Sequence, residues 1–293
     1  MEYNVNINGI DVAASYSQES IDNIFKPLLE RLCRIRQEKG RRILVMLAAP
    51  PGAGKSTLVS FLASYAQSHD LNCDDGEKNI KDLALKENSS KSYKFQAIGM
   101  DGFHRRQEYL QTHTMIVDGR EVKMVEVKGC PETFDLDKLR QRIEMLLNGN
   151  CENAGRNNNT ESIVKNENAG NIDMSTDAVV TWPAYDRHLH NPVEGAITVD
   201  GDIILLEGNY LLLDEPGWNE LSAMADYTIS IKADADMLRN RLVDRKEKSG
   251  NTREKSEQFV DYSDMRNVRL CLEHTKAADL ELCLEADSSY TAE

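Results

Sequence analysis

The segment AAPPGAGKST, residues 48–57, begins at the end of the apolar run ILVMLAA. An apolar run of this length is typical of a strand that is buried on both faces of a parallel sheet. In a glycine-rich turn after such a strand, backbone N–H groups can surround phosphate oxygens, and a helix that starts there adds the positive end of its dipole. The segment therefore predicts a phosphate-binding loop between a strand and a helix over residues 55–68.

The same segment nearly matches the pattern of nucleotide-binding loops, in which one glycine is followed by four residues and then by Gly-Lys-Ser or Gly-Lys-Thr. Gly54, Lys55 and Ser56 fit this pattern, whereas Ala49 stands where the first glycine is usual. In such loops the lysine reaches the β- and γ-phosphates and the hydroxyl binds Mg²⁺. We therefore expect ATP and Mg²⁺ as cofactors, with contacts to ATP from Pro51, Gly52, Ala53, Gly54, Lys55, Ser56 and Thr57. The alternative is a glycine-rich turn that binds no nucleotide.

Other apolar runs predict the rest of a sheet. YKFQAIGMD ends at Asp101, DIILLEG covers residues 202–208, YTISIKA starts at Tyr227, and ADLELCL lies near the C-terminus. Helical segments separate these strands, and such alternation gives a parallel sheet with helices on both faces. Asp118-Gly119, between alternating apolar residues, predicts a small hairpin. The expected class is α/β: a three-layer P-loop NTPase fold with a mainly parallel central sheet, a hairpin and a basic lid helix.

The chain predicts one large domain with an N-terminal addition and two polar excursions. Apolar residues at helical spacing from Ser17 to a stop at Lys39-Gly40 predict a helical extension over residues 1–40 that packs on the core. The main domain is expected over residues 41–287. Polar composition predicts excursions at about residues 71–92, with a short helix around residues 80–85, and at residues 149–176, which are rich in Asn. A helix over residues 135–147 is expected to bury Leu136, Leu139, Ile143, Met145 and Leu146.

The composition excludes several classes of partner. The formal charge of −14 argues against nucleic acid, because proteins that bind nucleic acid gain most of their affinity from clustered Lys and Arg. Six cysteines form no CxxC pair and no zinc pattern, as in a cytosolic protein with reduced thiols. No stretch approaches the roughly 18 apolar residues that span a bilayer, and the N-terminus lacks a signal-peptide pattern. We expect a cytoplasmic protein without membrane contact; a homodimer is left open.

Two carboxylates end predicted strands, at the edge of an α/β sheet where ligands bind. A carboxylate at the position of Asp101, near a γ-phosphate, can accept the proton of an attacking hydroxyl. Glu207 is expected to hold Mg²⁺, directly or through water, because an acid at the end of an apolar run is costly unless it has a partner. The alternative for both residues is an ordinary turn, and an Asp before Gly102 can cap one.

A predicted helix over residues 234–248 is rich in basic side chains. Arg241 and Arg245 are one turn apart and share a face of this helix. A basic lid that closes on ATP would stabilise the charge of the phosphoryl group in transfer. The alternative is a solvated helix in which interleaved acidic residues pair with the basic ones.

Several segments together resemble the phosphoribulokinase, uridine kinase and pantothenate kinase family of P-loop kinases. The resemblance covers residues 42–284 apart from the two excursions, and its marks are AAPPGAGKST, MDGFH with Asp101, GCPETFD at residues 129–135, PAYDRHLH at residues 183–190 and LLEGNYLL with Glu207. It is closest to the bacterial nucleoside or nucleotide kinase-like group of unassigned substrate. Two residues depart from the family pattern. Ala49 stands where the first glycine of the loop is usual, and Leu242 stands where uridine kinases tend to have a second Arg.

The resemblance implies an ATP-dependent kinase that phosphorylates a hydroxyl of a small metabolite such as a nucleoside, a sugar or a pantothenate-like compound. It implies Asp101 as general base, Lys55 and Ser56 as phosphate and Mg²⁺ ligands, and Arg241 and Arg245 as lid residues. Side chains that are expected to form the acceptor pocket are His104, Arg105, Tyr109, Tyr185, Arg187, His190, Asn209 and Tyr210. The alternative is a nucleotide-binding regulator or ATPase without a small-molecule acceptor.

Overall fold

The structure is a computed structural model that describes residues 1–7, 9–69, 71, 92–148 and 180–292. Most of the two polar excursions, including the short helix expected around residues 80–85, falls outside the described residues. None of the helices in the described ranges combines the length and the apolar character that crossing a membrane requires.

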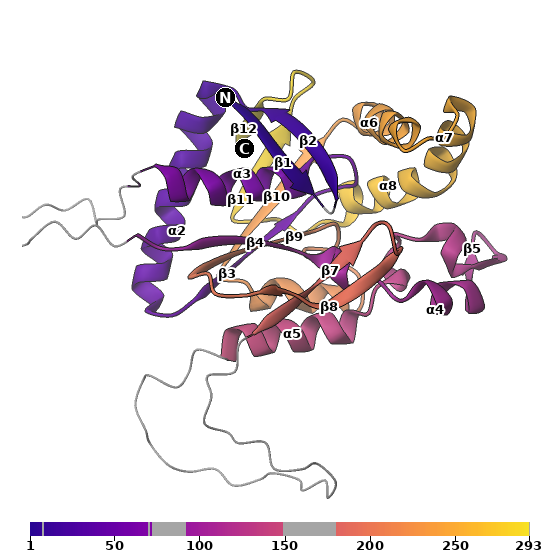
Figure 1. Cartoon of the computed structure of the whole chain (residues 1–293), viewed down its shortest axis with the longest axis horizontal. Coiled ribbons are helices and arrows are strands. Elements are labelled where there is room, and N and C mark those ends of the chain that lie inside the picture. Colours follow the sequence, from indigo (N-terminus) through magenta and orange to yellow (C-terminus); the bar gives the residue numbers. More distant parts are fainter. Residues whose placement is uncertain (8, 70, 72–91, 149–179, 293) are drawn as a thin grey trace, which may run out of the picture.

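The core of the molecule is a six-stranded sheet (Figure 1). In spatial order its strands are β12 (Tyr290–Ala292), β11 (Leu280–Leu284), β10 (Tyr227–Ala233), β3 (Ile43–Ala48), β9 (Ile203–Gly208) and β4 (Phe95–Gly99). All neighbouring pairs are parallel except β11 and β12. Every residue of β3 and β9 is buried, as the two continuous apolar runs predict.

Alternate residues of β3 face two separate hydrophobic clusters, which makes the fold three-layered. Ile43, Val45 and Leu47 join a cluster with helices α2 (Lys26–Lys39), α3 (Lys55–Ser68) and α6 (Ala235–Lys248). Leu44 and Met46 join a cluster with α5 (Leu136–Asn148) on the other face. In Figure 1, α3 and α5 accordingly lie on opposite sides of β4. The α/β sandwich expected from the sequence is confirmed.

Helix α5 differs from its prediction in one residue. Leu139, Ile143 and Leu146 are fully buried, but Met145 is 58% exposed. Met145 directly precedes Leu146, so a rotation of about 100° per residue turns it away from the buried side of the helix. Its assignment to the apolar side was wrong.

The N-terminal extension begins with strands rather than with a helix. β1 (Glu2–Ile7) and β2 (Ile10–Ser15) form an antiparallel hairpin that is separate from the central sheet. The chain becomes helical only at α1 (Gln18–Ser20), which continues through a π-helical turn, Ile21–Phe25, into α2. The helical spacing that begins at Ser17 thus coincides with the helical segment from Gln18 to Lys39, whereas residues 2–7 and 10–15 form strands.

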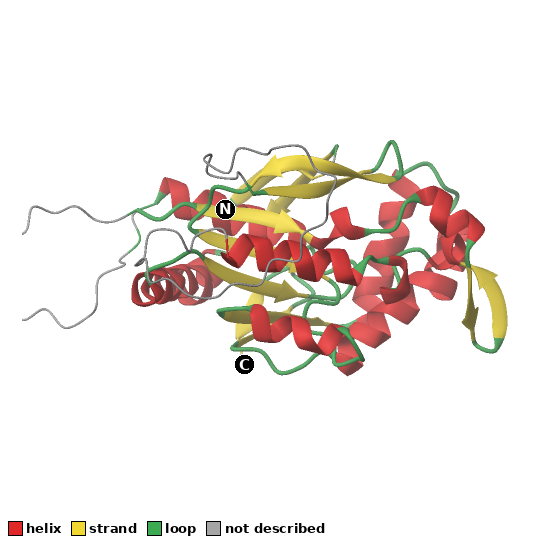
Figure 2. Ribbon diagram, turned by 90° about the horizontal axis from the view of Figure 1, so that it is seen from below, coloured by secondary structure: helices red, strands yellow, loops and turns green. Residues whose placement is uncertain are grey.

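Besides short 3₁₀ and π-helical turns, the described residues also form two further hairpins and three further α-helices. β5 (Thr114–Val117) and β6 (Arg120–Lys123) are joined by Asp118 and Gly119, both with positive φ, which confirms the predicted hairpin. This hairpin projects at the right-hand end of the molecule in Figure 2. β7 (Thr181–Asp186) pairs with β8 (Asn191–Thr198). The remaining helices are α4 (Gln107–Thr112), α7 (Arg253–Phe259) and α8 (Met265–His274).

Candidate active site

The phosphate-binding loop lies between β3 and the first turn of α3. Gly52 and Gly54 have φ values of 88° and 78°, a region that favours glycine. A Cβ at Gly52 would lie 3.2 Å from Cγ of Leu242, so α6 packs directly on the loop. Ala49 is buried at 3% exposure and is not among the described residues with positive φ. Its backbone does not require the usual glycine, which explains why this departure keeps the loop intact.

Glu207 reaches the start of α3 from the neighbouring strand β9. Its Oε1 accepts a hydrogen bond of 2.8 Å from the Ser56 hydroxyl. Burial raises the pKa of Glu207 to about 7; nearby Lys55 acts in the opposite direction, and Asp101 adds to the rise. A Cβ at Gly99 would lie 3.0 Å from the same Oε1, so the strand next to the carboxylate has no room for a side chain there. The two residues expected to hold Mg²⁺ are therefore in contact.

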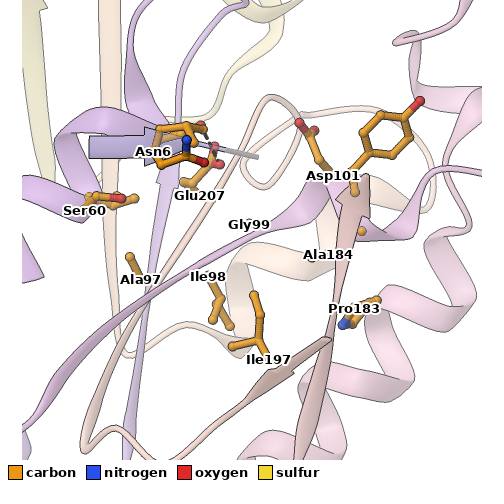
Figure 3. Close-up of a pocket in the computed structure, with 15 residues that line it drawn as sticks. Asn6, Ser60, Ala97, Ile98, Gly99, Asp101, Pro183, Ala184, Ile197 and Glu207 are labelled. Atoms are coloured by element: carbon orange, nitrogen blue, oxygen red, sulfur yellow. Dashed lines mark hydrogen bonds between the residues drawn. The ribbon is translucent and has the colours of Figure 1, made fainter. Parts of the chain in front are cut away.

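Asp101 lies in the 3₁₀ turn Met100–Phe103, directly after β4. The turn is pressed against β7, because a Cβ at Gly102 would lie only 2.2 Å from the Pro183 carbonyl oxygen. The Trp182 indole N–H also donates to the Gly99 carbonyl at 2.8 Å. These contacts hold Asp101 at the carboxyl edge of the sheet, where it faces the same cavity as Glu207 (Figure 3). This cavity has a volume of about 140 Å³ and also contains Ser56 and Tyr185 in its wall.

Aromatic rings form a wall beside Asp101. The His104 ring lies 3.9 Å from the Phe134 ring and 5.1 Å from the Tyr185 ring, between centroids. Its Nδ1 is 2.9 Å from the Asp101 carbonyl oxygen, and since a carbonyl only accepts, Nδ1 carries the proton. Burial lowers the pKa of His104, so the imidazole is neutral near pH 7. Later in the sequence, the Arg105 guanidinium carbon lies 4.9 Å from the centroid of the Tyr109 ring.

Lys128 is part of this wall, and the sequence analysis did not identify it. Its Nζ donates to the Tyr185 hydroxyl at 2.7 Å, to Gln107 Oε1 at 2.9 Å and to the His190 carbonyl at 3.1 Å. Burial lowers the pKa of Lys128, and Asp101 partly offsets this effect. The lysine ties the turn between β7 and β8 to α4. No local pattern marks it, because its partners lie 21 to 62 residues away.

Two of the expected acceptor residues have buried polar atoms without a partner. Arg187 Nε and Asn209 Oδ1 have no hydrogen bond to any described residue. The charge of Arg187 reaches the site, because it lowers the pKa of both Glu207 and His104. A donor and an acceptor of this kind are suited to contact with a bound ligand.

Tyr210 and His190, which were also expected in the acceptor pocket, are placed differently. Tyr210 is fully buried and its hydroxyl donates to the Gly129 carbonyl at 2.6 Å, so it supports the GCPETFD segment from within the core. His190 uses its carbonyl, and its side chain is exposed.

The two lid arginines on α6 also differ from each other. Desolvation lowers the pKa of Arg245, whereas the charges of Asp264 and Asp101 act in the opposite direction. Arg241 donates to the Ser288 hydroxyl at 2.9 Å. Of the two, Arg245 is therefore the one that the electrostatics place near Asp101.

Comparison with known proteins finds one relative along nearly the whole chain and several proteins named as kinases along parts of it. No family model matches the chain. It is 33% identical over 291 residues to the uncharacterised protein YggC of Escherichia coli, with 99% of this chain and 98% of YggC covered. It is 26% identical over 267 residues to a candidate uridine kinase of Schizosaccharomyces pombe, with 90% of each chain covered. A third relative, the ATP-dependent kinase YFH7 of Kluyveromyces lactis, is 28% identical over 172 residues, which are 53% of this chain and 46% of YFH7.

Solved structures show the same fold. The crystal structure of a candidate fructose transport system kinase from Silicibacter sp. TM1040 has a TM-score of 0.60 and 25% identity, and the match covers 86% of this chain and 98% of that one. YFH7 from Saccharomyces cerevisiae, a candidate P-loop kinase with a circular permutation, has a TM-score of 0.58 over 89% of this chain and 98% of its own. At 17% identity this second likeness shows the fold alone.

Proposed function

Because the chain belongs to the same family as the Escherichia coli protein YggC and is similar to P-loop kinases, we propose that it transfers the γ-phosphoryl group of ATP to a hydroxyl of a small metabolite. One observation carries this proposal. Ser56, Asp101 and Glu207 come from three separate elements and line one cavity beside the phosphate-binding loop. A carboxylate next to the γ-phosphate site serves as a proton acceptor for an incoming hydroxyl.

The transfer needs little covalent participation from the protein, so the residues act by position and charge. Lys55 and the N-terminus of α3 would hold the β- and γ-phosphates. As the acceptor oxygen bonds to phosphorus and the bond to ADP breaks, the hydroxyl proton passes to the Asp101 carboxylate. Lys55 and Arg245 would neutralise the charge that develops on the transferred group. The buried Nε of Arg187 is available to an anionic or hydroxyl oxygen of the acceptor.

The oxygens of Ser56 and Glu207 fit a magnesium ion. Mg²⁺ prefers oxygen ligands and is usually held by one or two protein side chains together with substrate phosphates and water. The buried carboxylate of Glu207 would be stabilised by a cation, because burial disfavours its charged form and raises its pKa. Mg²⁺ at this place would neutralise charge on the β- and γ-phosphates.

Asp101→Asn tests the assignment of the general base. We expect the variant to bind MgATP with unchanged affinity and to lose about 10²–10⁴-fold in kcat for acceptor phosphorylation, because the amide cannot take up the proton. Asp137→Asn, an exposed position on α5, is the matched control and should keep wild-type kcat. Full acceptor-dependent turnover by Asp101→Asn would show that another group is the base.

An acceptor screen tests the reaction class itself. ADP formation is measured with sugars, nucleosides and pantothenate-like compounds, and without any acceptor. ADP that rises with one of these classes supports the kinase. Slow ADP formation that no compound accelerates would contradict it and favour a nucleotide-dependent regulator or ATPase.

A further inference from the structure

Part of the cavity beside Asp101 is built by the N-terminal hairpin. Asn6 and Ile7, at the end of β1, line the cavity together with Ser56, Asp101 and Glu207. Figure 3 shows Asn6 in the same cavity wall as Asp101 and Glu207. The hairpin is not part of the central sheet that carries the catalytic groups, because β1 and β2 form a two-stranded sheet of their own. A wall contributed by a separate element can differ between proteins without changing the phosphate-binding machinery.

The hairpin is bound to the core at its base and lies close to the β7–β8 turn at its tip. At its base the Met1 ammonium donates to the Tyr16 carbonyl at 2.6 Å, and the Tyr3 ring packs edge-on against Phe61 of α3 at 5.4 Å. At its tip, a Cβ at Gly9 would lie 3.3 Å from Nε2 of His188, which belongs to the turn between β7 and β8. The hairpin therefore extends from α3 to the β7–β8 turn, alongside the cavity.

The tip presents a fixed amide to the cavity. Asn6 Nδ2 donates to Asp11 Oδ1 at 2.7 Å, and its Oδ1 accepts from the Gly9 N–H at 2.9 Å. A side-chain amide has two N–H groups and two lone pairs, so one donor and one acceptor site of Asn6 remain. Because the side chain is already oriented, little rotamer entropy is lost when it contacts a ligand.

The lining of the cavity indicates which part of a ligand fits. It contains two carboxylates, two serines and Asn6, and its other side chains are mainly apolar. Lys, Arg and His do not occur among these lining residues, all of which are described. Carboxylates and amides accept hydrogen bonds from hydroxyls, whereas an anionic group would be repelled there. Lys128 and Arg187 act electrostatically on His104 and are not among these lining residues.

A larger cavity of about 620 Å³ lies between the β5–β6 hairpin and α8. Its walls include Cys130, Glu132 and Asn267, but none of Ser56, Asp101 and Glu207. The hydroxyl that reacts must reach Asp101, so the smaller cavity is the one that contacts the atoms next to it.

We propose that Asn6 and Ile7 contact the neutral, hydroxyl-bearing end of the acceptor and determine which acceptor is phosphorylated. The inference rests on the proposed kinase function. Asn6 supplies a hydrogen bond to a hydroxyl, and Ile7 limits the size of the group beside it. The β1–β2 hairpin is then a specificity element of the active site.

The test compares two variants of the cavity wall with two matched controls on the same hairpin. Asn6→Ala is paired with Asn4→Ala, and Ile7→Trp is paired with Ala13→Trp; Asn4 and Ala13 are exposed and lie outside the cavity lining. With an acceptor found by the screen, we expect Asn6→Ala and Ile7→Trp to lower kcat/KM for that acceptor at least tenfold. The KM for ATP should change less than twofold, and both controls should match the wild type.

A second readout uses MgATP as the probe and needs no acceptor. The new indole at position 7 borders the cavity of Ser56 and Glu207, so its fluorescence should change on addition of MgATP. The indole at position 13 should not respond. If the wild type phosphorylates no compound, the kinase proposal fails, and this readout still decides whether the hairpin borders the nucleotide site. An unresponsive indole at position 7, or unchanged acceptor kinetics in both wall variants, would overturn the inference.

Discussion

Glu207 is a carboxylate that the fold buries almost completely. It is 7% exposed, and a buried carboxyl without a cation favours its protonated form. Its hydrogen bond from Ser56 and the charge of Lys55 favour the ionised form, yet burial prevails and the pKa rises to about 7. A group with this pKa changes its charge within the physiological range, which couples cation binding at this place to pH.

Proton uptake by Glu207 should make MgATP binding depend on pH. Protonated Glu207 cannot ligate Mg²⁺, so its contribution to MgATP affinity should be small below about pH 7 and present above it. Calorimetry at pH 6 and pH 8 measures MgATP affinity for the wild type and for Glu207→Gln. The advantage of the wild type should grow by up to about tenfold from pH 6 to pH 8, since a carboxyl of pKa 7 goes from mostly protonated to mostly ionised.

The variant serves as its own control, because titration of ATP itself is common to both proteins. An equal advantage at the two pH values would show that Glu207 does not exchange a proton on MgATP binding.

Residues that end strands were predictable, and residues that act across the fold were not. Asp101 and Glu207 stand out in the sequence because each follows an apolar run, and parallel strands bring such ends to one edge. Lys128 has no such signal, since its role depends on Tyr185, 57 residues away. Tyr210 is the opposite case, because an aromatic residue beside a strand end can equally pack inside the core, as its 0% exposure shows.

Among the elements, α6 connects the phosphate-binding loop to the basic residues. Leu238 and Leu242 are fully buried and pack against Gly52. This contact explains why Leu242 replaces the second Arg expected from the family pattern: an arginine there would place its charge in the apolar contact between helix and loop. The helix starts at Asp234, whose side chain accepts from the Met237 N–H at 2.8 Å.

The two arginines of α6 should differ in how much their replacement by alanine lowers kcat. Arg245→Ala should lower kcat by about 10²–10³-fold, because a donor near the transferred phosphoryl group is lost. Arg241→Ala should lower kcat much less, since its guanidinium is bound to Ser288. Steady-state kinetics with a confirmed acceptor gives both values. Equal losses in the two variants would mean that α6 moves as a lid and brings Arg241 to the phosphates as well.

The N-terminal hairpin could have been predicted. Tyr3, Val5 and Ile7 alternate with polar residues, and the dipeptide Asn8-Gly9 is a strong hairpin signal. The helical spacing begins only at Ser17 and carries no information on the residues before it. The place of the hairpin beside the cavity could not be predicted, because its contacts with α3 and with His188 depend on tertiary packing.

At the level of the whole molecule, the central sheet aligns segments that are far apart in the sequence. Leu47 pairs with Glu207 and Gly99 pairs with Glu207 on its other side, so the loop after β3 and the turn after β4 meet around β9. The alternation of strands and helices predicts a sheet of this kind. The order of the strands depends on tertiary packing, which the alternation alone does not specify. Any loss of register in the sheet would displace all three groups of the cavity together.

Asp226 fastens this sheet at the edge opposite the active site. Its carboxylate, 4% exposed, accepts two hydrogen bonds from Arg41, at 2.7 and 3.0 Å, and one from the Leu44 N–H at 3.0 Å. It thereby joins the starts of β3 and β10. Burial raises the pKa of Asp226, but these hydrogen bonds and one from Lys39 outweigh burial and hold the pKa below its ordinary value.

The charge of Asp226 should contribute to the stability of the fold in a pH-dependent way. Asp226→Asn should lower the free energy of unfolding at pH 7 by about 2–4 kcal/mol, because the Arg41 charge loses its partner. Since the pKa is depressed in the folded state, the contribution is complete above the ordinary carboxyl pKa of about 4 and is lost as pH falls below it. Urea denaturation at pH 7 and pH 3.5 should therefore give a smaller difference at the lower pH. Asp200→Asn is the control, because Asp200 is 56% exposed in its ion pair with Lys94 and should change stability little at either pH. A difference that persists undiminished at pH 3.5 would assign the effect of Asp226→Asn to packing rather than to charge.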